Sequence, residues 1–137
     1  MRERYTFTEP PYSLHDCPVT FVHDGDTLTL VTEYGMKSTR PPHMTNTGRV
    51  EFEGLDWDFC RAYILPSAGH YGRFEGEKLP LAELLTRCKE LRLDVMDEQF
   101  GYNCARFCGY ADIGDDLREL AVEIYHTGVL TYISDEI

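Results

Sequence analysis

The chain has 137 residues, enough for one domain that buries about 65–70% of its unfolded surface without disulfide or metal staples. Its 24 acidic and 13 basic residues give a net charge of −11, which repels a phosphate backbone, so we expect no nucleic-acid partner. The longest apolar run, Ala62–Leu65, is far shorter than a membrane span of roughly 18 residues, and no apolar leader follows Met1, which predicts a cytoplasmic protein with no membrane association.

The start of the chain predicts an edge element followed by a hairpin. Residues 1–13 contain adjacent prolines and little periodicity, as expected for an arm or an edge strand, because proline cannot donate to a central ladder. A hairpin fits residues 18–36 if Asp24-Gly25 forms a two-residue type I′ turn, which needs positive φ at both positions. Phe21 then faces Leu28, and the strand pair has one apolar face. The same register pairs His23 with Asp26 and Val19 with Leu30.

The middle of the chain predicts a second hairpin and then a helix. Residues 49–65 alternate in polarity around Glu53–Asp56, so that Phe52 faces Trp57 across a turn. Between residues 80 and 90 the apolar period changes to that of a helix, with Pro80 near its first turn. The further hairpin pair is Val50 and Phe59, and the residues at helical spacing are Leu81, Leu84, Leu85 and Cys88.

The last third of the chain predicts two more strand pairs. Residues 91–95 resume the strand period, and a return strand over about 104–110 follows a turn near 100–103. A Thr127-Gly128 turn then closes a final hairpin. A competing interpretation makes residues 115–126 a helix, because their apolar positions also fit helical spacing. The final hairpin would pair Tyr125 with Leu130 and Val122 with Ile133.

These elements predict an α+β fold in a single domain, residues 1–137. It is mainly an antiparallel β-sheet or a partly open barrel built from sequential hairpins, with one helix near 80–90 packed on it. An aromatic content of 12% supplies the bulky residues that strands favour. The expected core consists of Val19, Phe21, Leu28, Leu30, Val50, Phe52, Trp57, Phe59, Leu84, Leu85 and Leu93.

Five cysteines at irregular spacings predict reduced and mostly buried thiols, because their number is odd and they sit in apolar patterns. Cys104 and Cys108 lack a second pair at zinc-finger spacing, and neither Asp24-Gly25-Asp26 nor Asp112–Asp116 has the ligand pattern of an EF-hand. The glycine-rich stretch 66–76 lacks the Gly-Lys-Ser/Thr of a P-loop. We therefore expect no disulfide, no metal and no cofactor.

Two arrangements offer chemical groups for catalysis. His15-Asp16-Cys17 places an imidazole beside a thiol, although Pro18 and the following strand favour a turn at His15 and Asp16 with Cys17 entering the core. Asp56 and Asp58 flank Trp57 and could act as paired carboxylates, although a solvated strand face opposite a buried tryptophan explains the same alternation. Neither pattern is a catalytic motif, so we assign no catalytic residue.

Charge is segregated along the chain. Two acid-free stretches lead into two long polar loops, 37–48 and 66–79, which an antiparallel meander would bring to one end of the sheet. The tight turns at Asp24-Gly25 and Gly54-Leu55 would lie at the other end, which is acidic. The acidic end supplies the candidate binding residues Asp24, Asp26, Asp56 and Asp58. The cationic loops supply an alternative set, Lys37, Arg40, His43, His70, Tyr71 and Arg73.

One short segment carries a family resemblance. Leu14-His15-Asp16-Cys17, followed by a strand and by His23-Asp24-Gly25-Asp26, resembles small bacterial families that open with a Leu-His-Asp signature before a hairpin. Some of those families look like immunity proteins of contact-dependent or polymorphic toxin systems. The resemblance covers about residues 14–31, and it implies a β-rich domain with a protein-binding role and no catalytic residues.

Two functions from different classes fit these observations. The first is a non-enzymatic, immunity-like interaction protein whose acidic surface binds a basic protein partner. The second is a small anionic-ligand-binding protein, or an enzyme, that uses the cationic loops 37–48 and 66–79. Because the sequence contains no catalytic motif, it favours the first.

Overall fold

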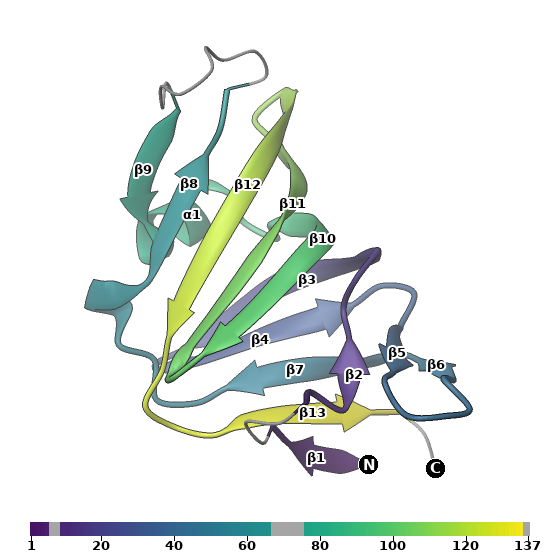
Figure 1. Ribbon diagram of the computed structural model, residues 1–137. Coiled ribbons are helices and arrows are strands. Elements are labelled where there is room, and N and C mark those ends of the chain that lie inside the picture. The colour runs from purple at the N-terminus through teal and green to yellow at the C-terminus, as the bar shows by residue number, and fades with distance from the viewer. Residues whose placement is uncertain (6–8, 67–75, 136–137) are drawn as a thin grey trace.

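The computed structural model describes residues 1–5, 9–66 and 76–135, and its secondary structure is mostly strand (Figure 1). The strands that precede the α-helix are β1 (Arg2–Arg4), β2 (Tyr12–Ser13), β3 (Cys17–Asp24), β4 (Thr27–Thr32), β5 (Met36–Ser38), β6 (Thr45–Asn46), β7 (Gly48–Phe52), β8 (Arg61–Ile64) and β9 (Glu77–Pro80). The 3₁₀-helix η1 (Trp57–Phe59) lies between β7 and β8. The α-helix α1 (Leu81–Arg87) is followed by β10 (Arg92–Gly101), β11 (Cys104–Ile113), β12 (Asp116–Tyr125) and β13 (Leu130–Ser134).

The described strands form an open antiparallel sheet. Ten of them follow the order β1-β13-β7-β4-β3-β10-β11-β12-β8-β9, and β2, β5 and β6 form a small second sheet. Because the order begins at β1 and ends at β9, the large sheet is not closed. The α+β fold class and the open antiparallel sheet are therefore as the sequence predicts. Residues 2–4 form an edge strand that pairs with β13.

The large sheet turns back on itself, so that its two halves face each other. In Figure 1, β4, β7 and β13 cross the view, whereas β8, β11 and β12 run steeply over them. The β3–β10 pairing joins the halves, and a β-bulge between Val95 and Asp97 increases the local twist of β10 there. Phe52 on β7 meets Phe107 on β11 edge-on, with ring centroids 6.1 Å apart. The core therefore lies between the two halves.

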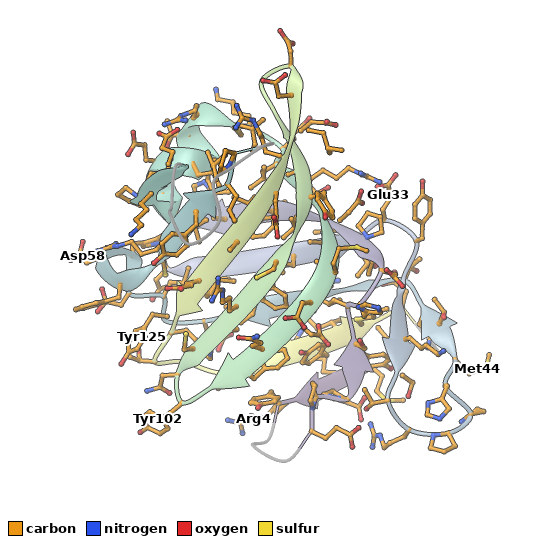
Figure 2. The ribbon with its side chains drawn as sticks, turned by 45° about the horizontal axis from the view of Figure 1, so that its top comes forward. Arg4, Glu33, Met44, Asp58, Tyr102 and Tyr125 are labelled. Atoms are coloured by element: carbon orange, nitrogen blue, oxygen red, sulfur yellow. The ribbon has the colours of Figure 1, made fainter. Side chains whose placement is uncertain are left out.

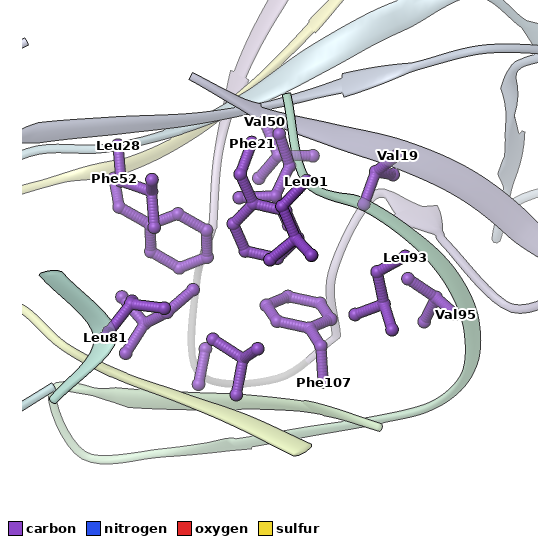
Figure 3. Packing of buried hydrophobic residues seen from close by; sticks show 14 of the residues in the cluster. Val19, Phe21, Leu28, Val50, Phe52, Leu81, Leu91, Leu93, Val95 and Phe107 are labelled. Atoms are coloured by element: carbon purple, nitrogen blue, oxygen red, sulfur yellow. The ribbon is translucent and has the colours of Figure 1, made fainter. Parts of the chain in front are cut away.

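The core is built from the inward positions of alternating strands and from one face of α1. Along β7, Gly48, Val50 and Phe52 are buried while Arg49 and Glu51 are half-buried, as a one-sided strand requires. The helix contributes Leu81, Leu84 and Leu85, and Figure 3 shows Leu81 among the buried hydrophobic residues of the core. The predicted helix is confirmed. It is shorter than residues 80–90, since it begins at Leu81, directly after the N-cap residue Pro80, and ends at Arg87.

The first hairpin has the predicted faces but a different turn. Its central residues are Gly25 and Asp26, since Asp24 pairs with Thr27 and Phe21 pairs with Leu30. Of these two central residues, only Gly25 has a positive φ, +60°, which fits a type II′ turn and avoids strain at a non-glycine position. The pairing shifts by two residues, so Phe21, Leu28 and Leu30 all remain buried.

The predicted second hairpin does not form. β7 pairs with β4 and β13, whereas β8 pairs with β12 and β9. Trp57 and Phe59 therefore lie in η1 and face no partner across a turn. Phe59 is 63% exposed and Trp57 is half-buried, so both were wrongly assigned to the core. The other residues of the predicted core are buried.

The final hairpin is also wrong, although both of its strands exist. β12 pairs with β11 and β8, and β13 pairs with β7 and β1. The Thr127-Gly128 segment carries the chain from one half of the sheet to the other, so β12 and β13 are not neighbours. The competing helix over 115–126 is contradicted as well, because residues 116–125 form a strand. The turn predicted near 100–103 and its return strand are confirmed.

The two long connections do not share one end of the sheet. A meander would make β7 and β8 neighbours, but five strands separate them in the sheet. In Figure 1, β5 and β6 lie at the lower right, whereas β8 ends and β9 begins at the upper left. The predicted common cationic end is therefore wrong. Within the described residues, no helix is long and apolar enough to cross a membrane.

Candidate protein-binding surface

The connection between β7 and β8 crosses from one half of the sheet to the other and is held by main-chain hydrogen bonds. The Leu55 N–H donates to the Asp26 carbonyl oxygen at 2.8 Å, and the Asp56 N–H donates to the Tyr125 carbonyl oxygen at 3.1 Å. Leu55 is buried and forms a β-bridge with His126. These contacts bring the β3–β4 turn, the β7–β8 connection and the end of β12 together.

Gly54 allows this crossing because its backbone conformation and its surroundings both exclude a side chain. Its φ is +67°, and a Cβ built there would lie 2.7 Å from the Gly128 nitrogen. The two connections are also hydrogen bonded, since the Thr127 N–H donates to the Gly54 carbonyl oxygen at 2.9 Å. Glycine is thus required on both grounds, and it fixes where the chain turns toward η1.

Trp57 ties η1 to the β3–β4 turn. Its Nε1–H donates to the Gly25 carbonyl oxygen at 2.8 Å, and its ring meets the His23 ring edge-on at 5.6 Å. Asp56 and Asp58, on either side of Trp57, are consequently held next to Asp26 on the neighbouring turn. A tryptophan in this role is half-buried because one edge of its indole must reach a surface carbonyl group.

An acidic hollow of about 300 Å³ results from this arrangement. Three of its lining residues are the aspartates at positions 26, 56 and 58, and the others include Gly54, Leu55, Trp57 and Thr127. Three of the four predicted acidic residues are therefore brought together. Asp24 is exposed on the same turn but does not line the hollow. The volume is at the lower end of the range of ligand pockets, about 300–1,000 Å³, and it suits a single side chain.

The carboxylates of the hollow gather three negative charges in one place with no ion pair among the described residues. Asp26, Asp56 and Asp58 make no ion pair with any residue that the structure describes. Elsewhere arginine and glutamate side chains pair closely, for example Arg87 with Glu77 at 2.6 Å. Further pairs are Arg92 with Glu33 at 2.6 Å, Arg49 with Glu51 at 3.4 Å and Arg2 with Glu51 at 3.5 Å. The hollow is thus a local concentration of uncompensated negative charge.

Two aromatic residues adjoin the residues that line the hollow: Phe59, which is 63% exposed, and Tyr125, which is half-buried. Phe59 follows Asp58 directly, and its ring lies 5.7 Å from that of Tyr125. Figure 2 shows Asp58, Tyr125 and Tyr102 along one margin of the molecule, with Met44 at the opposite margin. Tyr102 is 80% exposed at the tip of the β10–β11 turn. We define the acidic–aromatic surface as Asp26, Asp56, Asp58, Phe59 and Tyr125.

This surface has the chemistry of a protein interface. Ionised aspartates accept charge-assisted hydrogen bonds from lysine and arginine, which are about twice as strong as neutral hydrogen bonds. Aromatic residues are the commonest anchors of protein–protein interfaces, and large apolar side chains gain most when a partner covers them. The acidic–aromatic surface therefore offers both a charge to attract a basic side chain and an apolar area to bury.

The alternative cationic set is divided. Lys37, Arg40 and His43 lie in and between β5 and β6, whereas His70, Tyr71 and Arg73 lie outside the described residues. Arg40 forms an ion pair with Glu3, which raises the pKa of the guanidinium further. The His43 ring contacts the Ser38 carbonyl oxygen through Nδ1 at 3.1 Å. Two of the three described residues are thus engaged with their own chain.

The Leu-His-Asp segment serves the turn that leads into β3. The Leu14 N–H donates to Glu98 Oε2 at 3.0 Å, and the Asp16 N–H donates to the Val95 carbonyl oxygen at 2.8 Å. His15 contacts the Met96 carbonyl oxygen through Nδ1 at 2.6 Å. Cys17 is buried, and burial raises the pKa of its thiol to about 11, so the nucleophilic thiolate is disfavoured. These residues pin the turn to the bulge in β10.

The cysteines form no shared site. All five are free thiols, and only Cys17 and Cys60 are buried while the other three are half-buried, so the expectation that most are buried is wrong. The Cys60 thiol contacts the Asp56 carbonyl oxygen at 3.3 Å and accepts a hydrogen bond from the Tyr125 N–H at 3.3 Å. These contacts link the two ends of η1 to the end of β12. In the described part of the chain, no three His, Cys, Asp or Glu side chains converge as metal ligands.

Sequence reasoning found the acidic residues of the surface and missed its aromatic ones. Strand alternation predicts that Phe59 lies in the core and that Tyr125 belongs to a hairpin pair. The signal that could have corrected this is the close succession of Gly54, Asp56 and Asp58, which is more polar than a buried strand allows.

Comparisons of the chain with protein-family models, curated proteins and solved structures found no match.

Proposed function

We propose that this protein is a non-enzymatic interaction protein whose acidic–aromatic surface binds a basic protein partner. The observation that carries the proposal is the hollow lined by Asp26, Asp56 and Asp58, which make no ion pair with any described residue. The hollow lies beside the exposed Phe59. A lysine or arginine side chain of the partner occupies the hollow, and an apolar side chain covers Phe59 and Tyr125.

The charge distribution supports a basic partner over other classes. The chain has a net charge of −11, so a basic molecule is attracted at long range and then guided to the patch where negative charge is uncompensated. Attraction of this kind acts mainly on the association rate and weakens as salt is added, because screening shortens its range to about 8 Å at physiological ionic strength. An anionic ligand would meet repulsion over the same distance.

The Leu-His-Asp segment supports the immunity-like form of this function. The bacterial families that residues 14–31 resemble include proteins that look like immunity proteins of contact-dependent or polymorphic toxin systems, and the resemblance implies a protein-binding role. We therefore propose a basic toxin-like protein as the partner class. His15 and Asp16 hold the turn before β3, so they belong to the scaffold and are no part of the proposed interface.

A site-specific photocrosslinking experiment in cells of the native host tests the proposal. p-Benzoylphenylalanine at position 59 reports on the acidic–aromatic surface, and the same residue at position 44 is the control, because Met44 is 57% exposed and lies at the opposite margin (Figure 2). We expect position 59, and not position 44, to capture a protein of net positive charge. Capture of an acidic protein, or equal capture at both positions, would contradict the proposal.

A charge-matched pair of variants then tests the captured partner. The triple variant Asp26→Asn, Asp56→Asn and Asp58→Asn should weaken its binding at least tenfold, because three charge-assisted contacts become neutral. The control is Asp112→Asn, Asp115→Asn and Asp116→Asn near the β11–β12 turn, which changes the net charge equally but at a different site. If both triple variants bind the partner equally weakly, the hollow contributes only through the net charge of the protein.

A further inference from the structure

A groove of about 540 Å³ opens beside β1, one edge strand of the large sheet. It lies between β1, the β10–β11 turn and the connection from β12 to β13, and its walls include Tyr5, Phe100, Cys104 and Leu130. The rings of Tyr5 and Phe100 stack with centroids 5.1 Å apart, and Phe100 meets Phe107 of the core edge-on at 5.9 Å. An aromatic array thus extends from the core into the groove, which we call the seam groove.

His126 is a polar residue that hydrogen bonds hold in place in the lining of the seam groove. The residue is 8% exposed and lines the groove. Its Nδ1 is 3.0 Å from the Gly128 carbonyl oxygen, and its main-chain N–H donates to the Asn103 carbonyl oxygen at 2.9 Å. Because a carbonyl oxygen only accepts hydrogen bonds, Nδ1 carries the proton in this contact. Nε2 makes no hydrogen bond to any described residue.

The seam groove and the acidic hollow adjoin one another. Thr127 lines both, and the Thr127 and Gly128 N–H groups are bonded to the carbonyl oxygens of Gly54 and Glu53 at 2.9 and 3.0 Å. Figure 2 places Arg4, which lines the seam groove, along the same margin as Tyr102, Tyr125 and Asp58. One extended segment of a partner can therefore span both sites.

We infer that the seam groove takes an aromatic side chain of the basic partner, from a segment in which that side chain is flanked by lysine or arginine. The inference rests on the proposed function and specifies its partner sequence. The acidic hollow next to the groove selects the flanking charge, and the Tyr5–Phe100 stack offers an edge-to-face or offset contact to a further ring. An aromatic anchor in a partly formed pocket beside a charged contact is the usual composition of an interface hot spot.

Peptide titrations followed by amide chemical shifts test this inference. The ¹⁵N-labelled protein is titrated with acetyl-Lys-Lys-Phe-Lys-Lys-amide and, as the matched control, with acetyl-Lys-Lys-Gly-Lys-Lys-amide. We expect both peptides to shift the Leu55 and Asp58 amides at the acidic hollow. Only the phenylalanine peptide should shift the Gly101, Cys104 and Gly128 amides, and it should bind about tenfold more tightly, because one aromatic side chain is buried.

Two variants locate the anchor. Tyr5→Ser removes one wall of the seam groove, and Val129→Lys adds a second cation to a lining that already contains Arg4. Each should reduce the affinity of the phenylalanine peptide to that of the glycine peptide. Tyr34→Ser is the control, because Tyr34 is a 69% exposed tyrosine that lines neither site. The amide spectrum of each variant reports whether it is folded, and having two variants keeps the test valid if one of them is not.

The outcomes separate this inference from the proposed function. If both basic peptides bind at the hollow with equal affinity and the groove amides do not shift, the inference is overturned and the proposed function stands. If acetyl-Glu-Glu-Phe-Glu-Glu-amide fills the groove as tightly as the lysine version, the requirement for flanking basic residues is overturned. If neither basic peptide shifts the amides at the hollow, the proposed function itself fails.

Discussion

The acidic–aromatic surface and the small β2-β5-β6 sheet differ in how their charges are partnered. In the small sheet region, Arg40 is paired with Glu3 and His43 contacts the Ser38 carbonyl oxygen. At the acidic–aromatic surface, Asp26, Asp56 and Asp58 make no ion pair within the described chain, and Phe59 is 63% exposed.

Whether a charged segment of the sequence is available for binding depends on the partners that its side chains have in the fold. The acid-free stretch 34–50 gives the sequence a cationic segment, yet the fold supplies a carboxylate from β1 to Arg40. The aspartates of the β7–β8 connection meet further acidic and aromatic residues instead. Charged groups without an ion pair and exposed aromatic rings contribute little to the stability of the folded protein. Together they are groups that a binding partner can contact.

The largest expected effect contrasts two phenylalanines at the two ends of one segment. Phe52→Ala removes a fully buried ring from the core and should lower the free energy of unfolding by about 3–5 kcal/mol. Phe59→Ala removes an exposed ring and should change it by no more than about 0.5 kcal/mol. Urea unfolding of both variants checks this. A large loss for Phe59→Ala would mean that this ring belongs to the core and not to a surface kept for binding.

The second effect concerns the crossing at Gly54. Gly54→Ala forces a side chain into a φ of +67° and against the Gly128 nitrogen, 2.7 Å away. Gly114→Ala is the matched control, because its φ is +66° and no atom lies within 4 Å of the added Cβ. The control should cost about 1–2 kcal/mol from the backbone conformation alone. Gly54→Ala should cost about 1–3 kcal/mol more. Equal thermal or urea unfolding of the two variants would show that the close approach of the two connections is not required.

A smaller effect is expected for Trp57→Phe. Phenylalanine keeps an aromatic ring but cannot donate to the Gly25 carbonyl oxygen, so the stability should fall by about 1 kcal/mol, the net value of one hydrogen bond. The amide shifts of Gly25 and Asp58 should change together, because Trp57 joins their two segments. If the Gly25 amide is unaffected, Trp57 does not tie η1 to the β3–β4 turn.

The smallest effect is a pH dependence at Glu98. Burial raises the pKa of this carboxyl in the folded state, so the folded protein binds more protons than the unfolded chain between the unfolded and folded pKa values. Stability should therefore decrease as the pH rises through that window. Glu98→Gln should remove the decrease while its amide oxygen still accepts the Leu14 N–H. Urea midpoints measured from pH 4 to 8 check this, and an identical slope in the variant would contradict the assignment to Glu98.

Local patterns predicted the strands and the helix but not all of their neighbours. Strand alternation over residues 48–52 and helical spacing at Leu81, Leu84 and Leu85 depend on burial of one face, which the sequence records directly. The Gly54-Leu55 and Thr127-Gly128 segments carry ordinary turn chemistry, and the same chemistry serves a hairpin or a crossing between distant strands. The fold uses them as crossings because the two segments pack against each other, a long-range contact that no local pattern contains.

The candidate site was predictable to the same extent. The acidic residues follow from charge, which is read directly from the sequence, and three of them do converge. The exposure of Phe59 follows from η1, a single turn between β7 and β8 that replaces the expected strand. The seam groove depends on β1, β10 and the β12–β13 connection lying next to one another, so it could not be predicted without the strand order.

The central claim, that the acidic hollow guides a basic partner, is tested most directly by the salt dependence of association. The association rate of the photocaptured partner is measured by stopped flow from low to physiological ionic strength for three proteins: the wild type, the Asp26, Asp56 and Asp58 asparagine variant, and the Asp112, Asp115 and Asp116 control. We expect the first variant to associate more slowly and with a flatter salt dependence, and the control to keep an association rate and a salt dependence close to those of the wild type. Identical rates and slopes for the wild type and the first variant would contradict it.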